Sequence, residues 1–187
     1  MPFSDLVEEM GEKSEKIKVK FDGENLVVTD RSGIDSLASR GYGVKESDRL
    51  ILAPYEVLYL LSKEVVEVIG PSSEILEFKD VLDLFKSRDE NLWVRYLMYR
   101  DLRSRGYVVR EGFGLGIDFR VYERGTYGEK PATYLIYGIQ EGKPVSIGDL
   151  SKTLAYTQNL KKKLILAVLS RRGEVVYYSL SKLTFSK

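Results

Sequence analysis

One purely polar segment, KSRDEN at residues 86–91, divides a chain of short apolar runs into two halves. Soluble domains most often contain about 100–150 residues, so a chain of 187 residues can form one large domain or two small ones. Two small domains fit better, because each half holds its own series of strand-like and helix-like segments. We therefore predict an N-terminal domain over residues 1–90 and a C-terminal domain over residues 91–187.

The first half mixes strand and helix patterns. Two β-rich runs, IKVKF and NLVVTD, are joined by Asp22-Gly23-Glu24, which indicates a hairpin. Beyond the hairpin the pattern predicts a short helix ending at Gly41, a strand over residues 50–53, a helix beginning at Pro54, a strand over residues 65–70 and a helix over residues 73–85. This order predicts a small N-terminal domain built from both helices and strands.

The second half is richer in strands. Its first segment, ENLWVRYLMYRDLRSRG, carries apolar residues at helical spacing and ends at Gly106. Three strand-like runs follow, YVVREG, GIDFRVYERG and ATYLIYGIQEG, and glycine-containing turns separate them. A helix with Leu150, Leu154 and Thr157 at helical spacing, a central apolar strand KLILAVLS and a last strand EVVYYSLSKL complete the series. The order α-β-β-β-α-β-β predicts a mixed-sheet α+β domain.

The two halves differ sharply in charge. Residues 1–90 hold 12 Lys and Arg against 20 Asp and Glu, whereas residues 91–187 hold 17 against 8. A basic surface attracts polyanions and an acidic one repels them, so a nucleic acid is expected to lie against the second half. The same asymmetry is also explained if the halves attract each other or a partner subunit.

Composition excludes several chemistries. The chain has no histidine, the side chain that most often moves protons near neutral pH, and no cysteine for disulfides or thiolate metal sites. A charged fraction of 30% without cysteine is compatible with a thermophilic protein. No apolar run approaches the ~18 residues that cross a bilayer, and MPFSDLVEEMGEKSEK is acidic where an export signal would be basic. We expect a cytoplasmic protein without membrane contact.

Residues 94–125, VRYLMYRDLRSRGYVVREGFGLGIDFRVYERG, resemble the signature of archaeal tRNA-splicing endonucleases, a helix of the form YxVYRDLRxRGY followed by GFxxGxDFxVY. The similarity continues in ATYLIYGI, in KKKLILAVLSRRGEVVYYSL and in the N-terminal YEVLYLLSKEVVEVIG. The resemblance implies a nuclease-like C-terminal domain. It also implies cleavage of precursor tRNA at the two junctions of a bulge-helix-bulge, without a metal or another cofactor, to give 2′,3′-cyclic phosphate and 5′-hydroxyl ends.

The resemblance also implies a site of three residues. A tyrosine that assists deprotonation of the ribose 2′-hydroxyl falls on Tyr122, and a lysine that stabilises the charged phosphorane falls on Lys162. Lys161 and Lys163 are the neighbouring registers for the lysine and the expected RNA contacts. The histidine that protonates the departing 5′-oxygen falls on Pro131, which has no proton to give. A short deletion in this loop explains its absence equally well, and the chain contains no other histidine to substitute.

This missing acid indicates a non-catalytic, structural subunit. Some members of the family are heterotetramers of two catalytic and two non-catalytic subunits (α2β2), so the expected partners are a catalytic endonuclease subunit and precursor tRNA. An arginine that grips a bulge base in the family falls on Ala155. The turn at residues 171–173, RRG, stands where relatives carry an acidic loop that enters a partner's basic cleft.

The last strand is the expected joint between subunits, because the family pairs this strand with its copy in a neighbour. The predicted interface residues are Val175, Tyr177, Tyr178 and Leu180, and Val176 adds to their apolar surface. Core packing is the alternative interpretation of the two tyrosines, but the pairing of this strand in the family favours the interface role.

Other interpretations of these residues remain open. Tyr122 can be a packing or surface residue at a strand end, and Lys162 can be part of the solvated end of a helix. Asp118, Glu141 and Lys143 imitate the D…ExK arrangement of Mg²⁺-dependent nucleases, although EGKP reads as a turn and not as one strand. A catalytic homo-oligomer that uses a different acid is a further alternative.

Overall fold

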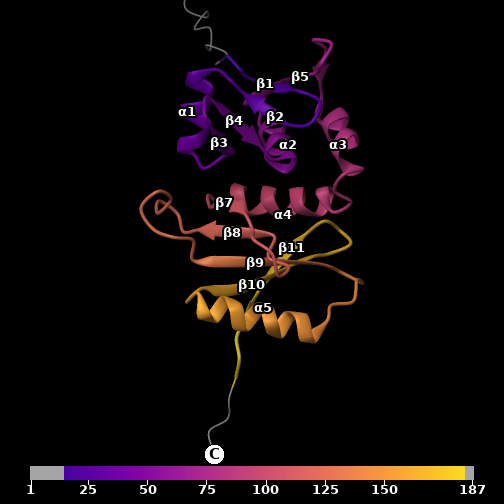
Figure 1. Cartoon of the computed structure of the whole chain (residues 1–187). Coiled ribbons are helices and arrows are strands. Elements are labelled where there is room, and N and C mark those ends of the chain that lie inside the picture. Colours follow the sequence, from indigo (N-terminus) through magenta and orange to yellow (C-terminus); the bar gives the residue numbers. More distant parts are fainter. Residues whose placement is uncertain (1–14, 184–187) are drawn as a thin grey trace, which may run out of the picture.

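The computed structural model describes residues 15–183, which form two β-sheets with helix α4 (Leu92–Ser104) lying between them (Figure 1). The acidic segment MPFSDLVEEMGEKSEK, from which we expected no export signal, falls almost entirely outside the described residues. No helix within residues 15–183 combines the length and apolar character that a membrane crossing requires. The mixed α+β fold class predicted from the sequence is confirmed.

The N-terminal sheet has six strands in the order β3-β4-β2-β1-β5-β6. Its elements are β1 (Ile17–Phe21), β2 (Leu26–Val28), α1 (Arg31–Ser39), β3 (Val44–Glu46), β4 (Arg49–Leu52), α2 (Pro54–Ser62), β5 (Val66–Ile69), β6 (Ile75–Leu76) and α3 (Phe78–Lys86). The predicted hairpin is present, because β1 and β2 pair antiparallel and the Asp22 carboxylate accepts the backbone N–H groups of Glu24 and Asn25.

Two short strands of this sheet differ from the prediction. Residues 73–85 were expected to form one helix, but Ile75 pairs with Ile69 in β6 and α3 begins only at Phe78. The turn after Gly70, whose N–H donates to the carbonyl of Glu74, returns the chain alongside β5 before a helix can start. Strand β3 was missed because all three of its residues are exposed, so it has no apolar alternation to detect.

The C-terminal sheet has five strands in the order β11-β10-β9-β8-β7. After α4 come β7 (Val108–Glu111), β8 (Phe119–Tyr122), β9 (Tyr134–Gln140), α5 (Ile147–Asn159), β10 (Lys163–Leu169) and β11 (Val175–Leu180), which is the predicted element order. Strands β9 and β10 are parallel because α5 carries the chain back across the sheet, and the other neighbours are antiparallel. Strand β10 lies inside the sheet, as its uninterrupted apolar run predicts.

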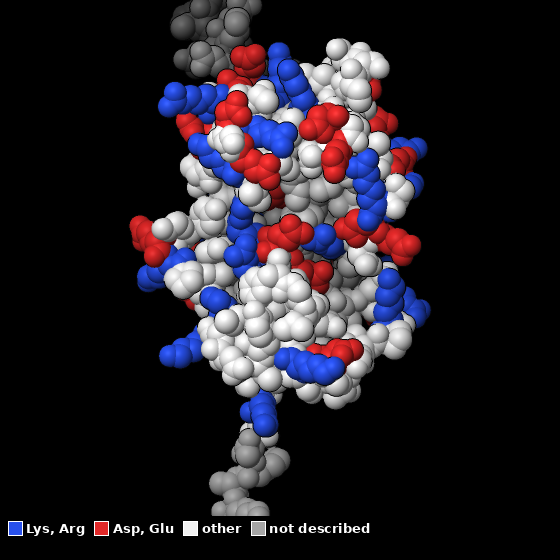
Figure 2. Space-filling view, viewed as in Figure 1, with Lys and Arg blue, Asp and Glu red and all other residues white. Residues whose placement is uncertain are grey.

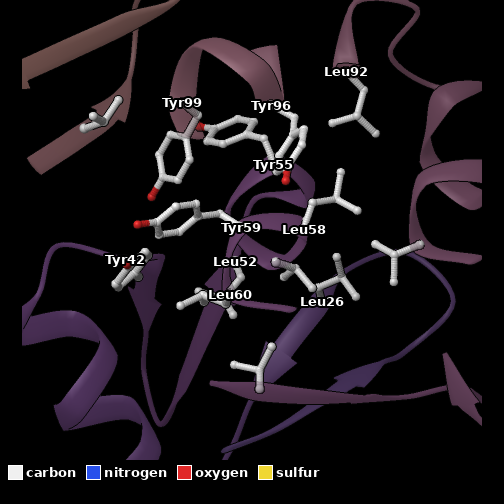
Figure 3. Packing of buried hydrophobic residues seen from close by; sticks show 14 of the residues in the cluster. Leu26, Tyr42, Leu52, Tyr55, Leu58, Tyr59, Leu60, Leu92, Tyr96 and Tyr99 are labelled. Atoms are coloured by element: carbon white, nitrogen blue, oxygen red, sulfur yellow. The ribbon is translucent and has the colours of Figure 1, made fainter. Parts of the chain in front are cut away.

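The two sheets share one hydrophobic core around α2 and α4. Figure 3 shows the rings of Tyr55, Tyr59, Tyr96 and Tyr99 facing one another between the two helices. The Tyr55 ring lies 5.0 Å from that of Tyr99 and 5.3 Å from that of Phe119 in β8, so the aromatic cluster reaches from the N-terminal helix to the C-terminal sheet. Aromatic pairs at such spacings add about 0.5–1.5 kcal/mol each beyond the area they bury.

Arginines of the second half also hold the first half in place. Both terminal nitrogens of Arg103 donate to the carbonyl of Arg40, each at 3.1 Å, and Arg110 donates to the carbonyl of Gly41 at 2.9 Å. The polar segment 86–91 connects α3 to α4. The division into residues 1–90 and 91–187 stays a prediction about how the chain is organised, with both parts contributing to a common core.

Two tyrosine hydroxyls give a matched test of this packing. The Tyr99 hydroxyl is buried without a hydrogen-bond partner among the described residues, whereas the Tyr177 hydroxyl donates to Asp101 at 2.8 Å. Tyr99→Phe is expected to raise the free energy of unfolding by up to about 1 kcal/mol, and Tyr177→Phe to lower it by about 1 kcal/mol. Urea denaturation measures both values. Equal losses in the two variants would contradict the packing described.

Candidate functional site

The ends of three neighbouring strands meet at one edge of the C-terminal sheet. The N–H of Thr133 donates to the carbonyl of Val121 at 3.0 Å, and the N–H of Lys163 donates to the carbonyl of Thr133 at 3.1 Å. These bonds join the end of β8 to the starts of β9 and β10. The residues just outside them, Tyr122, Pro131 and Lys162, therefore lie at the same edge.

The structure distinguishes the three lysines of the run. Lys161 has a positive φ of 54° and ends α5 in a turn, so that the next side chain points back to the sheet edge. The ammonium group of Lys162 donates to the carbonyl of Ala132, next to Pro131. Lys161 and Lys163 are exposed, and the Lys163 ammonium lies 5.9 Å from the centre of the Tyr134 ring. Of the three, Lys162 is thus the lysine whose ammonium group is hydrogen-bonded at this edge.

Tyr122 is half-buried and packs edge-to-face on Tyr127, with 5.0 Å between the ring centres. Tyr127 belongs to the loop between β8 and β9, and its ring lies against Gly41 of the N-terminal half. A Cβ atom on Gly41 would come within 2.4 Å of Val108 and 3.2 Å of the Tyr127 ring, and Gly41 also has a positive φ of 77°. Sequence analysis missed Tyr127, because its contacts join segments far apart in the chain.

This edge holds no histidine, the side chain best suited to proton transfer near neutral pH. Pro131 is exposed and carries no titratable group. Tyr134 donates its hydroxyl to Glu123 at 3.4 Å, and desolvation with the neighbouring Glu123 charge raises the Tyr134 pKa above its usual value near 10. Lys162 can stabilise an anionic phosphate, whereas the raised pKa of Tyr134 makes its hydroxyl a weak proton donor near neutral pH. The arrangement can hold a phosphate better than it can move a proton.

The residues of the alternative metal site do not converge. Asp118 and Lys143 line one cavity of about 420 Å³, but Glu141 does not line it and instead accepts the N–H of Arg171. The Asp118 carboxylate accepts the N–H of Gly138 at 2.7 Å, so it connects β8 to β9, and burial raises its pKa. Residues 15–183 hold no group of three His, Cys, Asp or Glu side chains suited to a metal ion.

The predicted interface residues of β11 point in different directions. Val175 and Tyr177 pack against the main core, and Leu180 packs against the smaller cluster on the α5 side of the sheet. Tyr178 is 55% exposed, and Val176, on the same face, is 46% exposed. Of the predicted interface residues, Tyr178 is therefore the one that is most exposed, together with its neighbour Val176.

Two further positions at which the sequence departs from the family pattern, Ala155 and the turn at residues 171–173, lie on the surface. Ala155 is exposed on α5. Arg171 and Arg172 are exposed in the tight turn between β10 and β11, which closes through the N–H of Ser170 and the carbonyl of Glu174. Figure 2 shows acidic and basic side chains interspersed over the upper part of the face in view and a largely uncharged area over the C-terminal part. The basic excess of the second half is therefore not gathered on this face.

Comparison with known proteins covers most of the chain. Residues 17–82 match the family model described as the tRNA intron endonuclease N-terminal domain, and residues 92–177 match the model of its catalytic C-terminal domain. The chain is 34% identical to a tRNA-splicing endonuclease of Methanococcus maripaludis over 174 residues, which are 93% of this chain and 98% of the relative. It is 32% identical to that of Pyrococcus horikoshii over 170 residues, 90% of this chain and 98% of the relative.

Proposed function

The chain belongs to the tRNA intron endonuclease family, and from this membership we propose that it is a non-catalytic, structural subunit of a heterotetrameric tRNA-splicing endonuclease. Two copies of this chain would join two catalytic subunits and act on precursor tRNA at bulge-helix-bulge junctions. The observation that carries the proposal is the composition of the β8-β9-β10 edge. Lysine and tyrosine are present there, and Pro131 stands where a proton donor is needed.

The chemistry explains why this one position matters. The ribose 2′-oxygen attacks the phosphorus, the bond from phosphorus to the 5′-oxygen breaks, and the proton lost from the 2′-hydroxyl must be matched by one gained at the 5′-oxygen. An efficient donor has a pKa near the working pH. Desolvation and the Glu123 charge raise the pKa of Tyr134, which makes its hydroxyl a weak proton donor at that pH, and the whole chain has no histidine. Leaving-group protonation is therefore the step that this chain fails to support.

A non-catalytic subunit is useful if it sets the distance between the two active sites of the complex. Cutting two junctions a fixed distance apart requires two active sites held at that separation, and two non-catalytic subunits can act as spacers. Support for assembly comes from β11, which is an edge strand with an exposed apolar face at Val176 and Tyr178. Unpaired strand edges of this kind tend to pair with another chain.

The isolated chain is expected not to cleave a bulge-helix-bulge RNA, with or without Mg²⁺, and to give cleavage after mixing with a histidine-bearing catalytic relative. Gel analysis of end-labelled RNA with mapping of the 2′,3′-cyclic phosphate measures this. Metal-independent cleavage by the isolated chain would instead favour a homo-oligomeric enzyme with another acid. Cleavage that requires Mg²⁺ would favour the Asp118, Glu141 and Lys143 hypothesis.

Substitutions at the edge are expected to have unequal effects in the two subunits. Tyr122→Phe and Lys162→Ala in this chain should reduce cleavage by the complex by less than about 10-fold, because neither group takes part in the chemical step. The equivalent changes in the catalytic partner should cost about 100-fold or more. Single-turnover rates at saturating protein separate these cases, and similar losses in both subunits would mean that this chain contributes a working site.

The outer face of β11 provides a test of assembly. Val176→Asp together with Tyr178→Asp is expected to abolish binding to the partner, because assembly would bury two unpaired carboxylates. Both side chains are exposed, so the isolated chain should keep its circular-dichroism spectrum. Val44→Asp is the matched control, since Val44 is an exposed valine on β3, an edge strand of the other sheet. Wild-type mass of the complex by light scattering in the double variant would exclude β11 as the joint.

A further inference from the structure

A second cavity, of about 290 Å³, opens beyond the end of α4 on the sheet face that carries the main core. The rings of Tyr107, Tyr134 and Tyr177 line it, and its aliphatic lining includes Val121, Ile136 and Ile165. It lies next to the candidate site, because Tyr134 follows Thr133, whose carbonyl accepts the N–H of Lys163. An aromatic wall with an apolar floor suits a flat ring system, and nucleobases stack on such walls.

Each of the three tyrosines has a cation above its ring. Arg105 lies 5.6 Å from the centre of the Tyr177 ring, Arg124 lies 5.4 Å from that of Tyr107, and Lys163 lies 5.9 Å from that of Tyr134. The cavity is thus apolar inside and basic at its rim. This combination complements a ligand with a planar ring and a phosphate group.

Two carboxylates also face this rim, but the three cations outnumber them, so the net charge of the rim is positive. Asp101 pairs with Arg105 at 2.7 Å and accepts the Tyr177 hydroxyl, while Glu123 accepts the Tyr134 hydroxyl. Among the ion pairs of residues 15–183, Arg105 is the only one of the three cations that takes part. Arg124 and Lys163 therefore remain able to contact a phosphate.

We propose that this cavity receives one unstacked base of an RNA strand, held between Tyr107 and Tyr134, with the adjacent phosphate on Arg124 and Lys163. The inference rests on the proposed function and deepens it, because it gives the subunit a direct RNA contact in addition to its role as a spacer. Stacking tolerates any base, so the cavity would select for a base that is free of its helix and not for one sequence.

The test uses the full chain alone and a short single-stranded oligoribonucleotide as the probe. Tyr107→Leu and Tyr134→Leu keep apolar volume but remove the stacking ring, and each is expected to weaken binding by about 10-fold. Tyr107→Phe and Tyr134→Phe keep the ring and should bind as the wild type does. Tyr178→Leu is the matched control, because Tyr178 is exposed on the opposite face of the sheet. Fluorescence anisotropy measures the affinities.

Crosslinking identifies the position of the base. An oligoribonucleotide with one 5-bromouridine, irradiated with the wild-type chain, should crosslink at Tyr107 or Tyr134 by mass spectrometry. Wild-type affinity in both leucine variants, or crosslinks confined to other residues, would overturn the proposal. So would loss of the crosslink on assembly with the catalytic partner, since the cavity would then be part of a protein interface.

The two proposals can fail separately. If the reconstituted complex cleaves precursor tRNA while the leucine variants bind RNA normally, the base cavity is wrong and the subunit role stands. If the crosslink forms at Tyr107 or Tyr134 but no complex with a catalytic relative cleaves RNA, the cavity stands and the subunit role is wrong.

Discussion

Packing of α4 against both sheets is the interaction on which the rest of the structure depends. Tyr99 of this helix is fully buried against Tyr55 and Tyr59 of α2 and against Phe119 of β8. Arg95, one turn earlier, lies 4.8 Å from the Tyr55 ring centre and bonds to Asp89 and Glu111. One helix thereby fixes the N-terminal sheet relative to β8, the strand that ends at Tyr122. The packing of this core therefore sets the position of the candidate site.

Local periodicity predicts most of the fold and little of the site. The order of the longer elements follows from apolar spacing, turn residues and helix ends, each of which depends on a few neighbouring residues. β3 and β6 escaped prediction because their pairing is decided by turns and by neighbouring strands and not by an apolar pattern of their own. The resemblance predicts Lys162 among three lysines, whereas the left-handed conformation of Lys161, which turns the chain just before Lys162, is not apparent from local periodicity.

The direction of the side chains in the last strand is also only partly predictable from local sequence patterns. Alternation places Val175 and Tyr177 on one face and Val176 and Tyr178 on the other, but it does not say which face meets α4. The hydrogen bond from Tyr177 to Asp101 of α4 settles this, and it depends on residues 76 positions apart. The cavity beside Tyr134 could not be predicted from the sequence either, because its three tyrosines come from β9, β11 and the turn before β7, which are far apart in the chain.

The residues of the β8-β9-β10 edge have structural roles that do not depend on catalysis. Lys162 joins the start of β10 to the segment before β9, and Tyr122 supports the Tyr127 ring that seats the β8-β9 loop against Gly41. Removing either side chain would loosen a contact between distant segments, so their presence does not require catalysis. Pro131 lies exposed at the same edge. The RNA contact that we propose therefore lies beside Tyr134, where aromatic rings and basic side chains come together, and not at Pro131.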